Sequence, residues 1–473
     1  RLRRGALRAP LPLHQLSLRA PLPLHQLSLH QLPATPKGGP TMNYTETLSW
    51  IHGTERFGSR LGLGRMGRLL HRMGDPHLKV PFIHVAGTNG KGSTTTLIAS
   101  ALTAGGFKTG KFISPYILEF RERMQIDGQM IPEETLAALA TQLRPIAEEF
   151  KAAGDPVTEF ELVTVLGLCW FAEQNCDIAV LEVGLGGRLD ATNIIPPPVV
   201  AVITRIDYDH TAILGDTLSA IAGEKCGIVK RGSTVISYPD QAGEALAVIR
   251  RRTEEENDPL LLPDLSQLTV LSSGLCGSRF CYRGEEYSIP LPGPHQVLNA
   301  VTALEALKAL SDTRFAVSPQ EIAAGFAAAR FPARLELLRQ SPPVLLDGAH
   351  NPNGGRALCD AVKSLGLHDL TAVVGMLRDK DCLPVLQMMA PYCARMIVTT
   401  VPNPRSYPAE EFSGLARSVC PRVTVCPDCQ EAARLALAEG GNGVLVFGSL
   451  YLASAVRPVM LAETEKNNAA PTV

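Results

Sequence analysis

The amino-acid sequence predicts an α/β protein, in which a mostly parallel sheet domain with a P-loop is followed by a smaller Rossmann-like α/β domain. Three observations support this fold class. From residue 79 onward, short apolar runs alternate with helical patterns, as they do in βαβ units. A second series of the same kind begins near residue 343. In the first series, a glycine-rich turn follows an apolar run and precedes a helical pattern, as in phosphate-binding loops.

The first series predicts five strands separated mainly by helices. The strands are expected at Val80–Val85, Lys108–Ile113, Ile178–Val183, Val199–Thr204 and Thr234–Ser237. The helices are expected at Ser93–Ala104, Glu133–Lys151 and Leu162–Gln174. Residues 264–290 contain short alternating runs, which predict a small antiparallel sheet. A helix at Gln296–Leu310 is expected to follow it.

The second series predicts five more strands with helices between them. They are expected at Val344–Leu346, Ala372–Val374, Met396–Thr399, Val423–Val425 and Val444–Phe447. We place a domain boundary near Arg330–Pro332, which gives domains of residues 42–330 and 331–473. Each of these is long enough to bury its own hydrophobic core.

Residues 1–41 are predicted to be a disordered leader outside the fold. They contain an eleven-residue repeat (APLPLHQLSLR, then APLPLHQLSLH), whose prolines exclude a helix. The segment has six basic and no acidic residues, but the prolines also argue against an amphipathic transit peptide. We interpret it as upstream sequence translated by mistake, with Met42 as the true start. Deleting residues 1–41 should therefore leave thermal stability and activity unchanged, and a clear loss of either would contradict this interpretation.

Composition excludes several classes of protein. Of 473 residues, 45% are hydrophobic and 19% charged, which is enough apolar material to exclude wholesale disorder. A net charge of −1 gives no support for a nucleic-acid partner. No run approaches about 18 apolar residues, so no membrane-spanning helix is predicted. The odd number of scattered cysteines, eleven, favours reduced thiols in a cytoplasmic protein, and the lone pair Cys426 and Cys429 does not predict a zinc site.

The strongest local motif is the segment 87–93, which reads GTNGKGS between a strand and a helix. Glycines let backbone N–H groups approach a phosphate, a lysine neutralises phosphate charge, and a hydroxyl can bind Mg²⁺. The spacing departs from the usual G-x-x-x-x-G-K-[ST] pattern, and a glycine-rich turn without function is the alternative. The candidate phosphate-binding residues are Thr88, Asn89, Gly90, Lys91, Gly92 and Ser93.

Polar residues also follow other predicted strands at their carboxyl ends, where open α/β sheets place their ligands. Glu182 ends one strand, and a buried carboxylate there is costly unless it binds a metal or a cation. The alternative is a loop carboxylate satisfied by hydrogen bonds. His210 follows the next strand along the chain and is a candidate metal ligand. In the second half, Asp347 and His350 follow one strand and the segment 375–381 follows the next. These positions predict an active site between two domains.

Nine segments, in order over residues 84–453, carry a resemblance to one known family. They read GTNGKGS, ISPY…FRERMQIDG, LEVGLGGRLDATN, DYDH…LGDTLSAIAGEKCGIVK, GPHQVLNA, ARLE, LDGAHNP, GMLRDKD and FGSLYLA. Together they resemble folylpolyglutamate synthase, which is often bifunctional with dihydrofolate synthase and belongs to the Mur-ligase-like ATP-dependent amide ligases. Two positions depart from the usual family pattern: Tyr116 stands where the family often has His, and Ala333 where it often has Gly.

The resemblance implies a role for each part of the site. Residues 42–330 would form the ATP-binding central domain, and residues 331–473 the glutamate-ligase domain. Thr88 to Ser93 would hold the ATP phosphates. The remaining nucleotide contacts would come from Asn299, Arg334 and Asp347. Mg²⁺ would be surrounded by Ser114, Glu182 and His210, beside a carbamylated Lys225. The incoming glutamate would lie near His350 and Ser449, and the pterin substrate near Phe160, Arg188 and Asp190.

The function implied is an ATP-dependent ligase that adds L-glutamate through an acyl phosphate to a folate, either alone or together with dihydropteroate, and the sequence does not separate these two activities. The resemblance implies a cytoplasmic monomer that binds only small molecules, with neither nucleic acid nor a membrane as partner. Two alternatives stay open. One is a Mur-type ligase for a different carboxylate, although only about 40 residues separate Met42 from the P-loop, too few for a separate UDP-binding domain. The other is a P-loop nucleotide switch without ligase activity.

Overall fold

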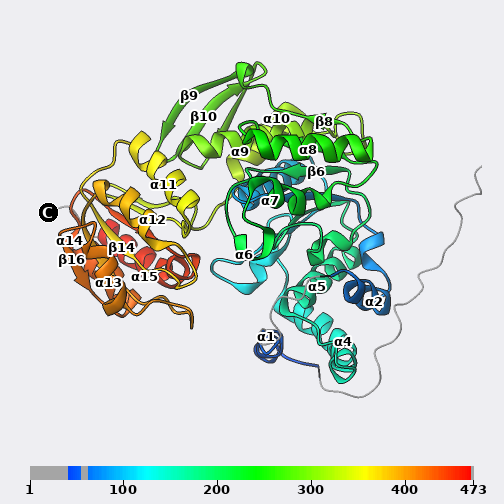
Figure 1. The fold of residues 1–473 in the computed structure, drawn as a ribbon, viewed down its shortest axis with the longest axis horizontal. Helices are drawn as coiled ribbons and strands as arrows, with labels where there is room; N and C mark the ends of the chain where they lie inside the picture. Colours follow the sequence, from blue (N-terminus) through cyan, green and yellow to red (C-terminus); the bar gives the residue numbers. More distant parts are fainter. Residues whose placement is uncertain (1–40, 55–61, 470–473) are drawn as a thin grey trace, which may run out of the picture. The chain divides into compact units, whose positions relative to one another are not determined.

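The computed structural model describes residues 41–54 and 62–469 (Figure 1). The predictions for residues 1–40 lie outside the described residues. Within them, three sheets follow one another along the chain: one of eight strands, one of three and one of six. The large sheets are mostly parallel and covered by helices, so the predicted α/β fold class is confirmed.

The eight-stranded sheet places the P-loop at its centre. Its order is β4-β3-β2-β5-β1-β6-β7-β8, and only β3 and β4 run antiparallel to their neighbours. Because β1 pairs with β5 on one side and β6 on the other, its carboxyl end is where the strand order reverses, and such a point favours a ligand crevice. The strands are β1 (Phe82–Ala86), β2 (Thr109–Phe112), β3 (Met124–Ile126), β4 (Gln129–Met130), β5 (Ile178–Glu182), β6 (Val200–Ile203), β7 (Thr234–Ser237) and β8 (Leu260–Leu261).

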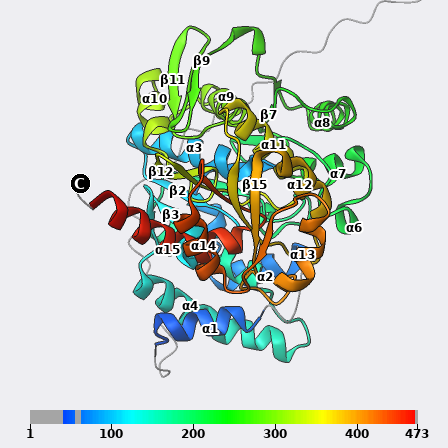
Figure 2. The same ribbon diagram turned by 90° about the vertical axis from the view of Figure 1, so that its left-hand side faces the viewer.

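Helices bury both faces of this sheet, because its central strands are apolar on both sides. On one face, α3 (Lys91–Ala104) packs against α9 (Pro294–Lys308) and α10 (Pro319–Ala328). On the other, α4 (Glu133–Ala152) and α5 (Glu159–Glu173) form a second core. The sequence analysis did not predict α1 (Tyr44–His52), which lies beside α4 (Figure 2), or α2 (Gly64–Arg72). The remaining helices of this half are α6 (Thr211–Leu214), α7 (Leu218–Lys225) and α8 (Gly243–Glu256).

Residues 268–289 form the predicted small antiparallel sheet, in the order β11-β10-β9. Its strands are β9 (Leu268–Gly274), β10 (Gly277–Tyr282) and β11 (Glu285–Ile289). On this sheet, the Phe280 ring packs against the Tyr287 ring, which in turn packs against Phe326 of α10, with ring centroids 5.8 and 6.0 Å apart. The small sheet is therefore joined to the core that also covers α3.

The six-stranded sheet has the order β12-β13-β17-β14-β15-β16 and is parallel except for β12. Its strands are β12 (Glu336–Gln340), β13 (Pro343–Leu346), β14 (Leu370–Val374), β15 (Cys393–Val398), β16 (Val423–Val425) and β17 (Val444–Phe447). Its helices are α11 (Pro352–Ser364), α12 (Cys382–Met389), α13 (Ala409–Arg417), α14 (Cys429–Glu439) and α15 (Leu450–Ala469). Apolar clusters cover both of its faces, as in a Rossmann-like domain.

The expected boundary near Arg330–Pro332 falls in the segment between α10 and β12. Residues on both sides of it belong to one compact unit, so the division at residue 330 stays a prediction. Among the described residues, no helix is long and apolar enough to cross a membrane.

Candidate active site

The glycine-rich segment forms a tight loop between β1 and α3. Its Thr88 and Asn89 N–H groups donate to the Arg205 carbonyl oxygen at 2.8 and 3.2 Å, which ties the loop to the end of β6. Gly87 and Gly90 have φ angles of +154° and +85°, where side chains are strained. A Cβ on Gly87 would lie 1.9 Å from the Thr204 hydroxyl oxygen. The loop therefore needs glycine for both its backbone conformation and its close packing.

The amino end of α3 is suited to hold a phosphate. The helix begins at Lys91, and its N-cap residue Gly90 offers no side-chain acceptor to the first N–H groups. Such N–H groups and the helix dipole attract anions. Among the described residues, the Lys91 ammonium donates only to the Thr88 carbonyl oxygen, at 3.3 Å, and so adds positive charge at the same place. A Cβ on Gly90 would lie 2.3 Å from Asn299 Oδ1, so the predicted nucleotide residue Asn299 adjoins this loop.

Two of the three predicted metal ligands lie side by side next to the loop. Glu182, at the end of β5, is buried and accepts a hydrogen bond from the Ser114 N–H at 3.2 Å. A Cβ on Gly92 would lie 3.3 Å from a Glu182 carboxylate oxygen. Burial raises the pKa of Glu182 above its usual value, and the Lys91 charge opposes this shift. Ser114 and Glu182 thus offer oxygen atoms beside Gly92 of the phosphate loop.

The third predicted metal ligand is His210. His210 precedes α6 and lines a small cavity together with Gly87, Lys91 and Lys225, whereas Ser114 and Glu182 line a larger pocket. Burial lowers the pKa of His210, so its imidazole is neutral at neutral pH and can accept a cation. In the part of the chain that the structure describes, no three His, Cys, Asp or Glu side chains meet as a complete metal-binding group.

Lys225 is buried behind the phosphate loop. Its ammonium donates to the Gly87 carbonyl oxygen at 2.7 Å. Burial lowers the pKa of Lys225 to about 7, and the nearby Lys91 charge adds to the shift. A substantial fraction of the side chain is therefore a neutral amine at neutral pH, which is the form that reacts with electrophiles.

The predicted nucleotide-binding residues Arg334 and Asp347 lie near each other. Arg334 is in the segment after α10, and Asp347 directly follows β13. Asp347 is partly buried and accepts hydrogen bonds from the N–H groups of Leu335 and Ala349, both at 2.7 Å. Burial raises the pKa of this carboxyl group, and the Arg334 guanidinium counteracts the shift. Asp347 therefore organises the turn that follows β13 while lying beside a cation.

His350 and Ser449 follow two adjacent strands, β13 and β17. Burial lowers the pKa of His350 to about 4, so the imidazole is neutral at neutral pH. Its Nδ1 lies 2.8 Å from the Gly348 carbonyl oxygen, and a neutral ring there donates through Nδ1–H. Nε2 is then left as an acceptor. Ser449 is buried, and its hydroxyl oxygen accepts the Tyr451 N–H at 3.1 Å.

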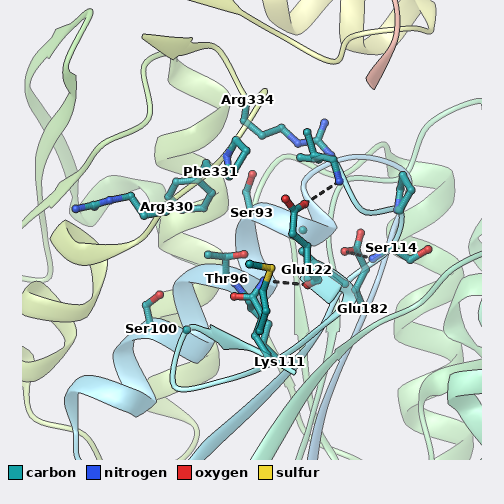
Figure 3. Close-up of a pocket in the computed structure, with 18 of the residues that line it drawn as sticks. Ser93, Thr96, Ser100, Lys111, Ser114, Glu122, Glu182, Arg330, Phe331 and Arg334 are labelled. Carbon is teal, nitrogen blue, oxygen red and sulfur yellow. Dashed lines mark hydrogen bonds between the residues drawn. The ribbon is translucent and has the colours of Figure 1, made fainter. Parts of the chain in front are cut away.

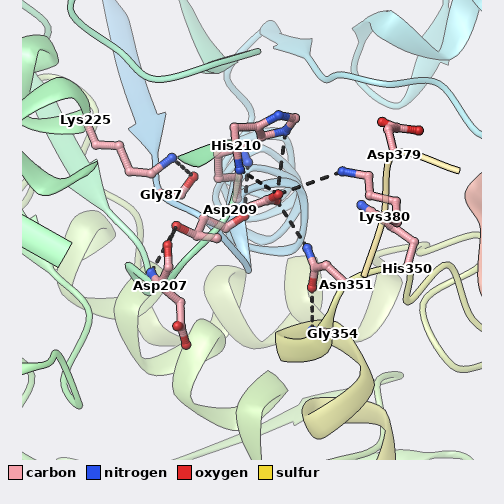
Figure 4. A network of polar contacts seen from close by, with 12 residues as sticks. Gly87, Asp207, Asp209, His210, Lys225, His350, Asn351, Gly354, Asp379 and Lys380 are labelled. Atoms are coloured by element: carbon pink, nitrogen blue, oxygen red, sulfur yellow. Dashed lines mark hydrogen bonds and ion pairs between the residues drawn. The ribbon is translucent and has the colours of Figure 1, made fainter. Parts of the chain in front are cut away.

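One carboxylate joins the two halves of the chain across the site. Asp209, after β6, accepts a hydrogen bond from Asn351 Nδ2 at 3.2 Å and lies 3.8 Å from the Lys380 ammonium nitrogen (Figure 4). Burial alone would raise the pKa of Asp209, but His210, Lys380 and His350 outweigh it and hold the pKa below its usual value. These residues lie in three separate segments of the sequence, and no local pattern in the sequence predicts that they meet.

The side chains of the predicted pterin-binding residues contact other residues of the chain. The Arg188 guanidinium pairs with Glu224 at 2.7 Å. Asp190 is buried and accepts hydrogen bonds from Thr192 and from the Leu185 N–H, so it shapes the loop after β5. The Phe160 ring packs over Gly184, where a Cβ would lie 2.5 Å from the ring. Of the three, only Phe160 offers an apolar surface.

Comparison with known proteins agrees with this arrangement. Residues 85–307 match the Mur ligase middle domain, and residues 333–450 match the Mur ligase glutamate ligase domain. Folylpolyglutamate synthase of Lacticaseibacillus casei is 36% identical over 432 residues, which cover 89% of this chain and 99% of the relative. The dihydrofolate synthase/folylpolyglutamate synthase of Bacillus subtilis is also 36% identical, with 88% and 98% covered. The chain belongs to the folylpolyglutamate synthase/dihydrofolate synthase family.

Solved structures of this family share the fold. Mycobacterium tuberculosis folylpolyglutamate synthase complexed with ADP and AMPPCP superimposes with a TM-score of 0.81 at 30% identity, covering 88% of this chain and 99% of that one. E. coli FolC in complex with DHPP and ADP gives a TM-score of 0.76 at 31% identity, covering 90% and 100%. The predicted family is therefore confirmed, and as a member of it the chain is an ATP-dependent amide ligase of the Mur type.

Proposed function

We propose that this chain is an ATP-dependent ligase that adds L-glutamate to a tetrahydrofolate, and also to dihydropteroate. The observation that carries the proposal is the position of the glycine-rich loop. The amino end of α3 and Lys91 lie directly beside the buried Glu182 and Ser114, in a chain of this family. The groups that can bind phosphate therefore lie next to a carboxylate that can bind a metal ion.

The chemistry requires activation of a carboxylate, because a carboxylate does not react with an amine at neutral pH. Transfer of the ATP γ-phosphoryl group gives an acyl phosphate, the glutamate amine attacks its carbonyl carbon, and phosphate leaves. Lys91 and the α3 N–H groups lie where they can stabilise the charge on the transferring phosphoryl group. The main contribution of the chain is to hold the reactants in place and keep water from the acyl phosphate.

The residues at the loop fit Mg²⁺, which prefers oxygen ligands and usually keeps waters and substrate phosphates in its shell. Glu182 offers a buried carboxylate and Ser114 a hydroxyl group, and the neutral His210 lines a small cavity that Lys91 of the loop also lines. When bound, the ion neutralises phosphate charge. Two protein oxygens at one point suit an ion whose other ligands come from ATP and water.

Lys225 fits the proposed carbamate. A carbamate forms when a neutral amine attacks CO₂, and the buried Lys225 amine has its pKa lowered to about 7. The product is an anion that can attract a metal, whereas the unmodified ammonium would repel it. Burial and the Lys91 charge are the causes of this lowered pKa, so the modification is favoured even when no metal ion is bound.

The other role assignments rest on position. His350 and Ser449 would receive the incoming glutamate, because both follow strands of the six-stranded sheet, where Asp209 joins the halves. Asn299, Arg334 and Asp347 would hold the rest of the nucleotide. Phe160 would contact the pterin, with Arg188 and Asp190 shaping the loop beside it. We further propose a cytoplasmic monomer with the domain boundary at residue 330.

One assay tests the proposed function. Purified protein is given ATP and L-glutamate with either tetrahydrofolate or dihydropteroate, and both phosphate release and the mass of the pterin product are measured. We expect phosphate release to require both glutamate and a pterin carboxylate, with a mass gain of one glutamyl residue. Phosphate release without either co-substrate would instead indicate a nucleotide switch. No ligation of either pterin would favour a Mur-type ligase for another carboxylate.

The Asp209 contact leads to a prediction about the same assay. Asp209→Asn removes the negative charge that faces the Lys380 ammonium group. It also replaces the carboxylate that accepts the Asn351 hydrogen bond by an uncharged amide oxygen, which is a weaker acceptor. Because hydrogen bonds to charged groups are among the stronger ones, we expect kcat/KM for glutamate to fall about tenfold, with a small change in Tm. Asp240→Asn, at a largely exposed carboxylate of the same half, is the matched control. Equal activity of the two variants would contradict a role for this contact.

A further inference from the structure

A pocket of about 300 Å³ opens beside the phosphate loop on the α3 side of the eight-stranded sheet (Figure 3). Its walls are residues 92–100 of α3, the strands β2–β4 and the segment 328–334. This volume is at the lower end of the range for small-molecule sites. Because Gly92, Ser93, Ser114 and Glu182 all line it, the pocket adjoins the point where the acyl group would react.

Lys111 is the cation on the sheet side of this pocket. Side chains alternate along a strand, so Lys111 of β2 faces α3 while its neighbour Phe112 packs into the core on the opposite face. Among the described residues, no hydrogen bond or ion pair is formed by the Lys111 ammonium group, and the charges that act on it are those of Glu122 and Glu182. The side chain is partly buried, and a partly desolvated ammonium group without a partner favours an anion.

The two carboxylates nearest to Lys111 already have partners. Glu122 accepts the N–H groups of Ile117, Leu118 and Glu119 at 2.8, 3.1 and 3.2 Å. Glu182 accepts the Ser114 N–H and lies beside the phosphate loop. Burial lowers the pKa of Lys111 to about 8, opposed by Glu122 and Glu182, so the side chain keeps its charge at neutral pH. The pocket therefore has a cation available for a ligand.

The two pterin substrates differ in the group that this cation would meet. In a folate, the carboxyl group to be activated is the γ-carboxyl of a glutamyl residue, which carries a free α-carboxylate a few bonds away. In dihydropteroate, the reacting carboxyl group is attached to an aromatic ring, and no second carboxylate is near. A cation beside the reaction point thus distinguishes the two substrates.

We propose that the pocket is a subsite for the terminal glutamyl residue of a folate, with Lys111 binding its α-carboxylate and so selecting folates over dihydropteroate. This inference rests on the proposed function. Lys111 acts as a binding residue that affects the affinity for one substrate and leaves ATP binding unchanged. Arg334, which lines the same pocket nearer the second half, adds positive charge to it.

The test combines two variants with two substrates. Lys111→Met removes the charge, Lys111→Arg keeps it, and Lys108→Met is the matched control, outside the pocket and directly before the same strand. The substrates are tetrahydropteroylglutamate and its analogue in which 4-aminobutyrate replaces glutamate, so that only the α-carboxylate is missing. KM and kcat are measured for each pair, with KM for ATP as an internal reference.

We expect the wild-type protein to show a KM at least about tenfold higher for the analogue than for the natural substrate, as for a lost charge-assisted hydrogen bond. In Lys111→Met the two KM values should be nearly equal, and Lys111→Arg should retain most of the difference. KM for dihydropteroate and ATP should change less than about twofold. A difference that persists in Lys111→Met would overturn the proposal.

The wild-type comparison of the two substrates needs no variant, so it holds even if Lys111→Met fails to fold. Equal KM values for tetrahydropteroylglutamate and the analogue in the wild-type protein would overturn the subsite alone, because ligation would still occur. Absence of ligation with every pterin would overturn the proposed function, and the subsite with it. These two failures are therefore distinguishable in one experiment.

Discussion

Lys91→Ala should lose ATP turnover by about a hundredfold or more while the protein stays folded. The ammonium group stands at the amino end of α3, where phosphate charge would lie, and removing a group that stabilises a transferring phosphoryl group costs about this much. Within residues 41–54 and 62–469, its only hydrogen bond is a 3.3 Å contact to the Thr88 carbonyl oxygen, so little folding stability depends on it. Turnover is measured as phosphate release, and Tm by circular dichroism.

Lys363→Ala, at an exposed lysine of α11, serves as the control for this experiment and should behave as the wild-type protein. A Lys91→Ala variant that kept near-normal turnover would mean that segment 87–93 is merely a structural turn. A variant that lost both turnover and its thermal transition would instead assign Lys91 a folding role, contrary to its few contacts.

Lys225→Ala and Lys225→Arg should both lose at least about a hundredfold in activity, because neither can form the carbamate. Lys225→Ala leaves a cavity beside Gly87 in which acetate could supply the missing carboxylate and partly restore activity. Lys225→Arg keeps the positive charge, so acetate should not help it. Activity at the wild-type rate in Lys225→Arg would show that the carbamate has no role.

A second measurement on Lys225 does not depend on activity. With ¹³C-labelled bicarbonate, the wild-type protein should show a carbamate carbon signal that is absent from Lys225→Arg. Because only the neutral amine reacts with CO₂, and the pKa of Lys225 is lowered to about 7, the signal should grow as pH rises from 6 to 8. An unmodified Lys225 at pH 8 would contradict the proposal even if its variants were inactive.

The strands and the phosphate loop could be predicted because their signals are local. The predicted strands Thr234–Ser237, Val423–Val425 and Val444–Phe447 agree with β7, β16 and β17. Buried parallel strands are short apolar runs, which a sequence displays directly. The start of α5 was placed three residues late. Thr158 and Glu161 form a capping box there, a signal that the sequence contained, whereas the helix is buried nearly all round and shows little periodicity.

Two strands that the sequence does not predict, β4 and β12, lack such a signal. β4 is two exposed residues, and β12 is a partly exposed strand at the edge of its sheet. An edge strand needs no buried face, so its residues show no apolar pattern. α1 was missed although Asn43 and Glu46 form a capping box at its start. Here the pattern was present in the sequence and was not used.

The sequence by itself determined which residues carry the chemistry: a glycine-rich loop with Lys91, and acids and histidines that follow apolar strands. Only the tertiary structure decided which of them meet. It paired Asp209 with Asn351, 142 residues away, and placed Ser114 beside Glu182, 68 residues away. It also turned Lys111 toward a pocket beside the site. Strand order and crossovers set these distances, and they arise from packing between segments far apart in the chain, which local patterns do not encode.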